Sequence, residues 1–381
     1  MFRRSQFASV LPRASRGGRI LGALLLASAL VTGGCASSKA GEGAPAPTAA
    51  AAATVASPYG QDAAYAVGLT SMTFEDAVRH RTLKPVIWYP AAPDTRMAEQ
   101  TASTIFVPFF AAKDVPVSDA KARWPVVLLS HGNGGEAINM AWFGAHLAAH
   151  GFIVVSVNHP GNSYGDTSPE GYVRGWERPK DFTSILDHLL KDPTWGPRMD
   201  TERIGASGHS MGGYTALALV GARLNLAFIA NVCTAPETRM HPGCEGLRDV
   251  DYRRIDLDVA RASYQDPRVH AAFAMAPGMA GTYEPRDLTE VQSPVELVLA
   301  KGDELMSHED NGMQLAGRLP KARTVVLDDA GHFSFLPECS PLGFKVTPEL
   351  CRDAVAGTRA ASQARTKAEA VAFFRSALDV R

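Results

Sequence analysis

The chain has 381 residues and a formal net charge of −1, with 46 % hydrophobic and 20 % charged residues. This length and composition suit one large α/β domain with additional segments. A polyanion-binding protein would carry a basic excess that is absent here, so we expect no nucleic-acid partner. The charge is uneven, because five arginines and no acidic residue fall within residues 1–34. The rest of the chain is therefore mildly acidic.

The N-terminus has the pattern of an export signal. Arginines precede an apolar run over residues 20–31, which is too short to span a bilayer but suits the core of a signal peptide. Two glycines then precede Cys35, as in the lipobox of bacterial lipoproteins, although Thr32 departs from that pattern. We predict a signal peptide over residues 1–35 with a lipid anchor on Cys35, and plain cleavage as the alternative. The protein would then be a periplasmic or outer-membrane-anchored lipoprotein in a bacterium, and otherwise secreted.

Residues 36–58 are small, rich in alanine and proline, and nearly free of large apolar groups. Such a segment cannot form a core, so we predict a flexible linker followed by one folded domain over residues 59–381. Two strands, at residues 65–73 and 81–89, are expected to open this domain as an antiparallel pair. The apolar patch at residues 105–110 either lines a substrate entrance or packs on the core.

After residue 124, strand and helix patterns alternate, which predicts a parallel sheet. A continuous apolar run, typical of a buried parallel strand, occurs at residues 125–130, and further strands are predicted at residues 152–157, 203–207, 269–275, 295–299 and 324–327. Helical patterns occur before residue 150 and at residues 178–190, 211–221, 311–319 and 364–380, and residues 223–268 have the character of an insertion. The fold class predicted is α/β, with a central, mostly parallel sheet of about eight strands and helices on both faces.

A G-x-S-x-G pattern lies between a predicted strand and a predicted helix, and its centre is Ser210. A serine at such a sharp strand-to-helix turn is a nucleophile elbow, and Gly208 and Gly212 supply the room that this turn needs. The side chain of His209, inside the elbow, is expected to point away from the nucleophile. The alternative is a glycine-rich helix start that Ser210 merely caps.

A nucleophilic serine needs a base to take its proton and an acid to orient that base. In this architecture they follow in the order serine, acid, histidine, after the ends of strands. His332 follows the strand at 324–327 and is the predicted base, whereas three other histidines fall on helices. Asp303 follows the strand at 295–299 and is the predicted acid. The carboxylates near enough to compete with it are Glu304, Glu309 and Asp310.

The oxyanion of acyl transfer needs two backbone N–H donors. One is expected from Met211, at the start of the helix after the nucleophile. The other is expected from the HGNGG loop at residues 131–135, with Asn133 as the predicted donor and Gly134 as the alternative. No dinucleotide or phosphate-loop motif is present, and we predict no cofactor.

Four cysteines follow Cys35, and an even number in an exported protein favours disulfides. They are Cys233, Cys244, Cys339 and Cys351. Four cysteines allow three connectivities, of which the pairing of sequence neighbours closes two short loops. A metal site is the competing interpretation, but no C-x-x-C spacing supports it.

These motifs resemble the α/β-hydrolase superfamily, and more narrowly the bacterial proteins called predicted dienelactone hydrolases and the plasma-type platelet-activating-factor acetylhydrolases. The resemblance covers about residues 65–375 and rests on the runs at residues 88–90, 131–135, 149–162, 203–213 and 330–336. It implies an α/β-hydrolase fold and a secreted or lipid-anchored serine esterase that acts on a small-molecule or lipid ester. Polyester and cutinase-type hydrolases share the GHSMGG run and are the competing substrate class.

Two departures from these families limit what the resemblance implies. Dienelactone hydrolases use a cysteine nucleophile where this chain has Ser210. The acetylhydrolases take their acid after the strand before the one that Asp303 follows, where residues 276–279 offer no carboxylate. Other chemistry on the same residues, such as peptide hydrolysis or acyl transfer to an alcohol, and a non-catalytic envelope protein are the remaining hypotheses.

Overall fold

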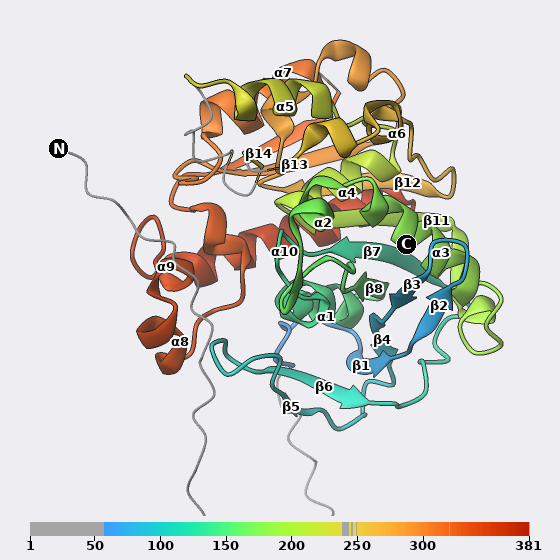
Figure 1. Ribbon diagram of the computed structural model, residues 1–381. Helices are drawn as coiled ribbons and strands as arrows, with labels where there is room; N and C mark the ends of the chain where they lie inside the picture. The colour runs from blue at the N-terminus through green and yellow to red at the C-terminus, as the bar shows by residue number, and fades with distance from the viewer. Residues whose placement is uncertain (1–56, 238–243, 245–246, 249, 320, 381) are drawn as a thin grey trace, which may run out of the picture. The chain divides into compact units, whose positions relative to one another are not determined.

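The computed structural model describes residues 57–237, 244, 247–248, 250–319 and 321–380 (Figure 1). The predicted signal peptide, Cys35 and almost all of the predicted linker lie outside these residues. All described residues belong to one compact unit, Val55–Arg381. Within them, no helix has both the length and the apolar character that crossing a membrane would require.

A ten-stranded sheet organises the fold, in the order β14-β13-β12-β11-β7-β8-β4-β1-β6-β5. Its strands are β1 (Ala66–Ser71), β4 (Pro85–Ala91), β5 (Ala98–Gln100), β6 (Phe109–Lys113), β7 (Trp124–Ser130), β8 (Ile153–Val157), β11 (Met199–His209), β12 (Val269–Met275), β13 (Val295–Ala300) and β14 (Arg323–Leu327). Every pair from β14 to β8 is parallel, whereas β4 runs antiparallel to both β8 and β1. The predicted mostly parallel sheet and its antiparallel opening pair are confirmed.

The sheet has ten strands where about eight were expected from the alternating pattern. The two extra strands, β5 and β6, form the edge opposite to β14 (Figure 1). They are short and partly exposed, so their residues carry no clear alternation of apolar and polar side chains. The apolar patch at residues 105–110 is divided: Phe106 is buried, but Val107 and Phe110 are 41 % and 36 % exposed.

Strand β7 contributes side chains to the hydrophobic cores on both faces of the sheet. All seven of its residues are buried, and its side chains alternate between the two faces of the sheet. Val126 and Leu128 pack on one side with α3 (Glu177–Leu189) and α4 (Met211–Leu219). Val127 and Leu129 pack on the other side with α1 (Ala141–Ala149) and α10 (Arg359–Ala377). Helices therefore cover both faces, as predicted.

The remaining elements are short and lie outside the main sheet. Two hairpins are formed by β2 (Phe74–Asp76) with β3 (Arg81–Leu83) and by β9 (Asn162–Ser163) with β10 (Asp166–Thr167). The short helices are α2 (Pro169–Val173), α5 (Leu226–Thr234), α6 (Leu257–Arg261), α7 (Met313–Arg318), α8 (Pro341–Val346) and α9 (Pro348–Cys351). Of these, α5, α6 and α7 lie at the β14 end of the sheet (Figure 1).

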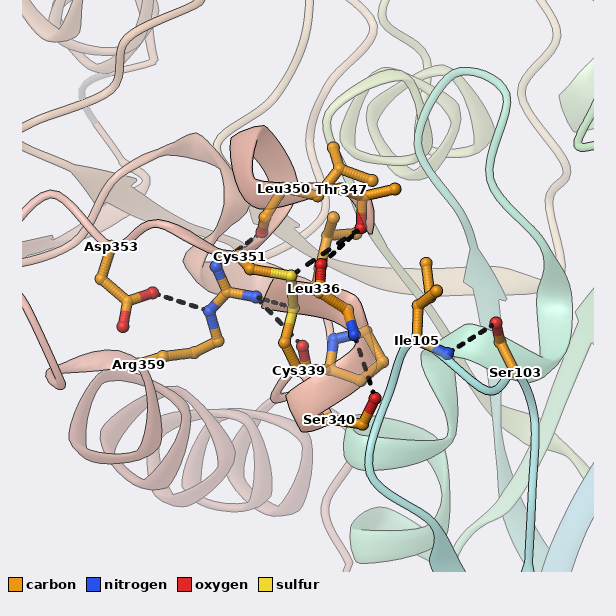
Figure 2. The surroundings of a disulfide bond; sticks show 12 residues. Ser103, Ile105, Leu336, Cys339, Ser340, Thr347, Leu350, Cys351, Asp353 and Arg359 are labelled. Atoms are coloured by element: carbon orange, nitrogen blue, oxygen red, sulfur yellow. Dashed lines mark hydrogen bonds and ion pairs between the residues drawn. A yellow bond between two sulfur atoms is a disulfide. The ribbon is translucent and has the colours of Figure 1, made fainter. Parts of the chain in front are cut away.

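Two disulfides join the cysteines that are neighbours in sequence, Cys233 to Cys244 and Cys339 to Cys351. Figure 2 shows the second one beside Arg359, whose guanidinium donates to the carbonyl oxygens of Pro337 and Leu350. Disulfides of this kind fit a protein that folds in an oxidising compartment outside the cytoplasm. The second disulfide closes the loop that follows His332 along the chain.

Candidate active site

Ser210 occupies the turn between β11 and α4. Its backbone has φ 57° and ψ −119°, a conformation that costs a residue with a side chain of order 1–3 kcal/mol. The turn is held from both sides, because the Ser210 N–H donates to Met275 O at 3.0 Å and the Gly278 N–H donates to Ser210 O at 2.8 Å. The serine is 8 % exposed. This is the strained strand-to-helix geometry of a nucleophile elbow.

The two glycines of the motif are required by close backbone contacts. A Cβ at Gly208 would lie 2.3 Å from Gly212 O, and a Cβ at Gly212 would lie 1.9 Å from Ser130 O. Both distances are far below van der Waals contact. The glycines thus let β11 and α4 approach each other and the end of β7, which fixes where the serine stands.

Asp303 and His332 meet beyond the ends of β13 and β14. The Nδ1 atom of His332 lies 2.8 Å from Asp303 Oδ2, and both side chains are almost fully buried. Asp303 Oδ1 accepts the backbone N–H groups of Leu305 and Met306 at 3.0 and 2.7 Å, so the carboxylate is held in place. Because the carboxylate oxygen accepts from Nδ1, that nitrogen carries the proton and Nε2 has a free lone pair.

The three competing carboxylates do not reach the imidazole. Glu304 Oε2 accepts the backbone N–H of His332 at 2.9 Å, so it supports the loop rather than the ring. Glu309 and Asp310 are exposed in a π-helical turn, His308–Gly312. Asp303 is the carboxylate that the structure brings to the ring.

Among the described contacts, no hydrogen bond joins the side chains of Ser210 and His332. His209 lies against His332, with ring centroids 4.7 Å apart. The expectation that the His209 side chain points away from the nucleophile stays a prediction. Burial, followed by the nearby His332, lowers the pKa of His209 well below its ordinary value, so it is a neutral packing partner. Catalytic hydrogen bonds are often long before substrate binds.

The residues predicted to bind the oxyanion flank the nucleophile. Met211 is the first residue of α4, where a helix leaves backbone N–H groups unpaired. The HGNGG loop passes directly beside the serine, because a Cβ added at Gly132 would lie 3.4 Å from Ser210 Cβ. In the part of the chain that the structure describes, no hydrogen bond takes up the backbone N–H of Asn133 or Met211.

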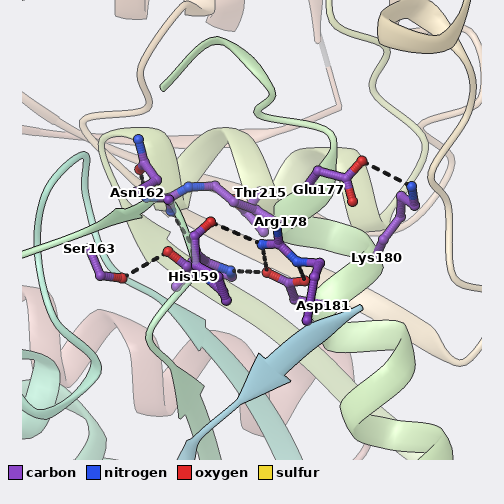
Figure 3. Close-up of polar contacts among 12 residues, drawn as sticks. His159, Asn162, Ser163, Glu177, Arg178, Lys180, Asp181 and Thr215 are labelled. Atoms are coloured by element: carbon purple, nitrogen blue, oxygen red, sulfur yellow. Dashed lines mark hydrogen bonds and ion pairs between the residues drawn. The ribbon is translucent and has the colours of Figure 1, made fainter. Parts of the chain in front are cut away.

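A second cluster of polar side chains lies behind this loop, and sequence reasoning missed it (Figure 3). His159 bridges Ser130 and Asp181, with His159 Nε2 at 3.0 Å from Ser130 Oγ and Nδ1 at 2.9 Å from Asp181 Oδ2. Arg178 donates to Ser130 Oγ at 3.1 Å. Their side chains are buried, yet each follows an apolar strand or lies on a helix, where the sequence offers no motif.

Groups of three or more His, Cys, Asp or Glu side chains placed to hold a metal ion are absent among the described residues. A strained serine, a carboxylate-oriented histidine and unpaired N–H groups each follow the carboxyl end of a strand in the parallel part of the sheet.

Curated relatives match parts of the chain. Cutinase 2 of Thermobifida cellulosilytica is 27 % identical over 132 residues, which are 34 % of this chain and 47 % of that protein. Cutinase cut1 of Thermobifida fusca is 27 % identical over 132 residues, which are 34 % of this chain and 39 % of that protein. Lipase 1 of Moraxella sp. (strain TA144) is 36 % identical over 85 residues, 22 % of this chain and 24 % of that protein. The chain thus matches less than half the length of these relatives.

The fold has a solved counterpart in a ferulic acid esterase from Streptomyces cinnamoneus. The match covers 84 % of this chain and 91 % of the esterase chain, with a TM-score of 0.55 and 21 % sequence identity. The likeness is therefore one of fold. A family model described as the alpha/beta hydrolase family matches residues 126–341, which is more than half of the chain. The chain belongs to the alpha/beta hydrolase family.

Proposed function

We propose that the protein is a serine-dependent hydrolase of carboxylic esters, with Ser210 as nucleophile, His332 as base and Asp303 as the acid that orients it. The observation that carries this proposal is the 2.8 Å hydrogen bond from His332 Nδ1 to Asp303 Oδ2, after the ends of strands in the sheet whose β11 leads into a serine with φ 57°. The similarity to cutinases and a lipase, and the fold shared with a ferulic acid esterase, support ester hydrolysis in general.

The reaction would proceed through an acyl-enzyme in two steps. His332 Nε2 takes the proton of Ser210 as Ser210 Oγ attacks the ester carbonyl, and the backbone N–H groups of Met211 and Asn133 bind the oxyanion. His332 then protonates the leaving alcohol. A water molecule, deprotonated by the same nitrogen, attacks the acyl-enzyme and releases the acid. Asp303 stabilises the imidazolium that forms in each step. Loss of one oxyanion donor would cost about 2.7–4 kcal/mol of the barrier.

The second candidate is a polyester or cutinase-type hydrolase that uses the same residues. The matches to several cutinases favour it over a peptidase or acyltransferase. A small-molecule or lipid ester and an insoluble polyester differ in acyl chain length and physical state. For its location, we propose export followed by anchoring through a lipid on Cys35; the two disulfides support export.

The test is hydrolysis of p-nitrophenyl esters from acetate to palmitate, by the purified protein and by its Ser210→Ala form. Activity that depends on Ser210 and prefers short chains supports the esterase. A preference for long chains, or release of soluble products from a polyester film, supports the second candidate. A folded wild-type protein that neither hydrolyses any of these esters nor reacts with a fluorophosphonate would contradict both and indicate a non-catalytic protein.

A further inference from the structure

The buried cluster behind the HGNGG loop invites interpretation as an anion site, because arginines surround a cavity there. The cavity, of about 260 Å³, is lined by Arg79, Arg81, Arg174 and Arg178 together with His159 and Glu177, among others. The donors of three of these arginines, however, are already used within the protein. Arg79 and Arg81 both bind Asp181, and Arg178 bonds to the HGNGG loop and its neighbours. The cluster is therefore built to hold protein groups.

Arg178 is the centre of this arrangement. It is 2 % exposed, and no ion pair among the described residues includes it. Its guanidinium instead donates to neutral oxygens: Ser130 Oγ at 3.1 Å, His131 O at 2.6 Å and Gly132 O at 3.1 Å, and Asn162 Oδ1. Burial, partly offset by the charge of Asp181, lowers the pKa of Arg178 to about 9. The side chain thus stays a cation at neutral pH.

The two carbonyl groups that Arg178 binds belong to two consecutive peptide units. The carbonyl of Gly132 shares its peptide unit with the N–H of Asn133, and the carbonyl of His131 shares its unit with the N–H of Gly132. In a trans peptide the C=O and N–H point in opposite directions. Fixing both oxygens on the arginine therefore directs the two N–H groups away from it. The same loop passes beside the nucleophile, because a Cβ added at Gly132 would lie 3.4 Å from Ser210 Cβ.

Two further contacts lock this arrangement. Asn162 accepts from Arg178 and donates its side-chain amide to Asn133 Oδ1 at 2.6 Å, so the same arginine also holds the side chain of the expected donor. Ser130 accepts from Arg178 and donates to His159 Nε2, and His159 Nδ1 donates to Asp181. The arginine is thus anchored at its far side by a buried chain that ends on a carboxylate.

We propose that Arg178 is a positioning residue for the oxyanion-binding loop: it orients the peptide unit that presents the Asn133 N–H and polarises it toward the oxyanion. This inference rests on the proposed function. A hydrogen bond from a cation to a carbonyl strengthens the N–H donor of the same peptide. The effect is largest when negative charge develops in the transition state, so the loss of Arg178 lowers kcat more than it raises KM.

The experiment compares Arg178→Met and Arg178→Lys with the wild-type protein in p-nitrophenyl ester hydrolysis. Active sites are counted by fluorophosphonate titration, so that misfolded molecules do not enter kcat. We expect kcat per titrated site to fall about 100-fold for Arg178→Met and about tenfold for Arg178→Lys, with KM changed less than about threefold. Affinity for a trifluoromethyl ketone, whose adduct with the serine carries an oxyanion, should fall in parallel with kcat.

A matched control is Arg268→Gln. Arg268 is a partly buried arginine that pairs with Asp266 and Asp187 and makes none of the contacts to the HGNGG loop that Arg178 makes. This variant should lose thermal stability and keep its kcat per titrated site. A kcat within about twofold of wild type in both Arg178 variants would overturn the inference and leave the arginine a purely structural residue.

Two safeguards separate the outcomes. If neither Arg178 variant folds, the test uses Ser130→Ala, which deletes one oxygen that Arg178 binds. Its kcat per titrated site should fall several-fold, up to about tenfold. An unchanged kcat would overturn the inference. If the wild-type protein shows no turnover that depends on Ser210, the proposed function itself is wrong, and the inference falls with it. If the wild-type protein is active and the variants keep its kcat, the inference about Arg178 is wrong while the proposed function stands.

Discussion

Two chains of serine, histidine and aspartate side chains follow the ends of strands in this molecule. One is the catalytic chain that we propose, Ser210, His332 and Asp303; the other contains Ser130, His159 and Asp181, which are hydrogen-bonded to one another. Ser130 is paired with Gly208 across β7 and β11, two residues before Ser210. In both chains the histidine Nδ1 lies against an aspartate oxygen, at 2.8 Å in the first and 2.9 Å in the second.

The serines differ. Ser130 is the last residue of a regular strand, is fully buried, and has its oxygen between His159 and Arg178. Ser210 has a positive φ, is 8 % exposed, and has no side-chain hydrogen bond to its histidine. The better hydrogen-bonded chain is thus the one whose serine no substrate can reach. Hydrogen bonds alone do not make a nucleophile; the backbone turn and an accessible oxygen are also needed.

The largest effect expected separates the two serines. Ser210→Ala should lower kcat by a factor on the order of 10⁶ with the fold intact, because the nucleophile is gone. Ser130→Ala should lower it by about tenfold at most, because one supporting hydrogen bond is lost. Ester hydrolysis and covalent labelling with a fluorophosphonate both measure the difference. Labelling that persists in Ser210→Ala and disappears in Ser130→Ala would reverse the assignment.

The two aspartates give the next contrast. Asp303→Asn should lower kcat about 10⁴-fold, because an amide in this place favours the wrong tautomer of His332. The mature fold should be unaffected, as circular dichroism can verify. The matched control is Asp310→Asn, an exposed residue of the same loop region, which should retain wild-type kcat. A large loss in Asp310→Asn and none in Asp303→Asn would identify a different acid.

The sequence predicted the first chain because each of its members stands beside a local signal. Ser210 lies between glycines, and Asp303 and His332 follow apolar strands whose order in the sheet is set by the alternating pattern. The parallel order of β7, β11, β12, β13 and β14 then brings residues that are far apart in sequence to one edge. Local pattern and topology agree here, which is why the contact between Asp303 and His332 could be predicted from the sequence.

The second chain could not be predicted in this way. Its members come from a strand end, a loop and the middle of α3, and their only common feature is burial of polar groups, which a sequence does not show. Charged residues such as Arg178 and Asp181 in a helical pattern are expected on its exposed face, whereas the structure buries both. Strands β5 and β6 were missed for a related reason: an edge strand that is half exposed need not alternate.

Asp181 should matter for stability where Asp303 matters for rate. Burial raises the pKa of Asp181, but the hydrogen bonds and charges of His159 and Arg81 outweigh it and lower the pKa to about 2. Asp181→Asn removes the buried carboxylate that pairs with Arg79 and Arg81. We therefore expect a loss of about 3–5 kcal/mol in the free energy of unfolding. Urea unfolding measures this. The control is Asp187→Asn on the same helix, an exposed partner of Arg268, which should cost much less.

The smallest effect concerns pH. Burial, and then the charge of Arg178, lowers the pKa of His159 to about 4, whereas in the unfolded chain it lies near about 6.5. Between these values the unfolded chain binds a proton that the folded protein does not. The contribution of His159 to the free energy of unfolding is therefore fully present above about pH 6.5. It is lost as the pH falls toward 4, by up to about 1.4 kcal/mol per pH unit.

Replacing His159 with glutamine removes this titration, so the difference in the free energy of unfolding between wild type and His159→Gln should shrink as the pH falls from 7 to 4.5. The matched control is the glutamine variant of the half-buried His188 on α3. A constant difference across that range would mean that the pKa of His159 is the same in the folded and unfolded protein, so that the folded protein would carry a protonated His159 below about pH 6.5. The Ser130 oxygen would then accept from His159 as well as from Arg178, and the buried chain would carry a charge that the catalytic chain acquires only during turnover.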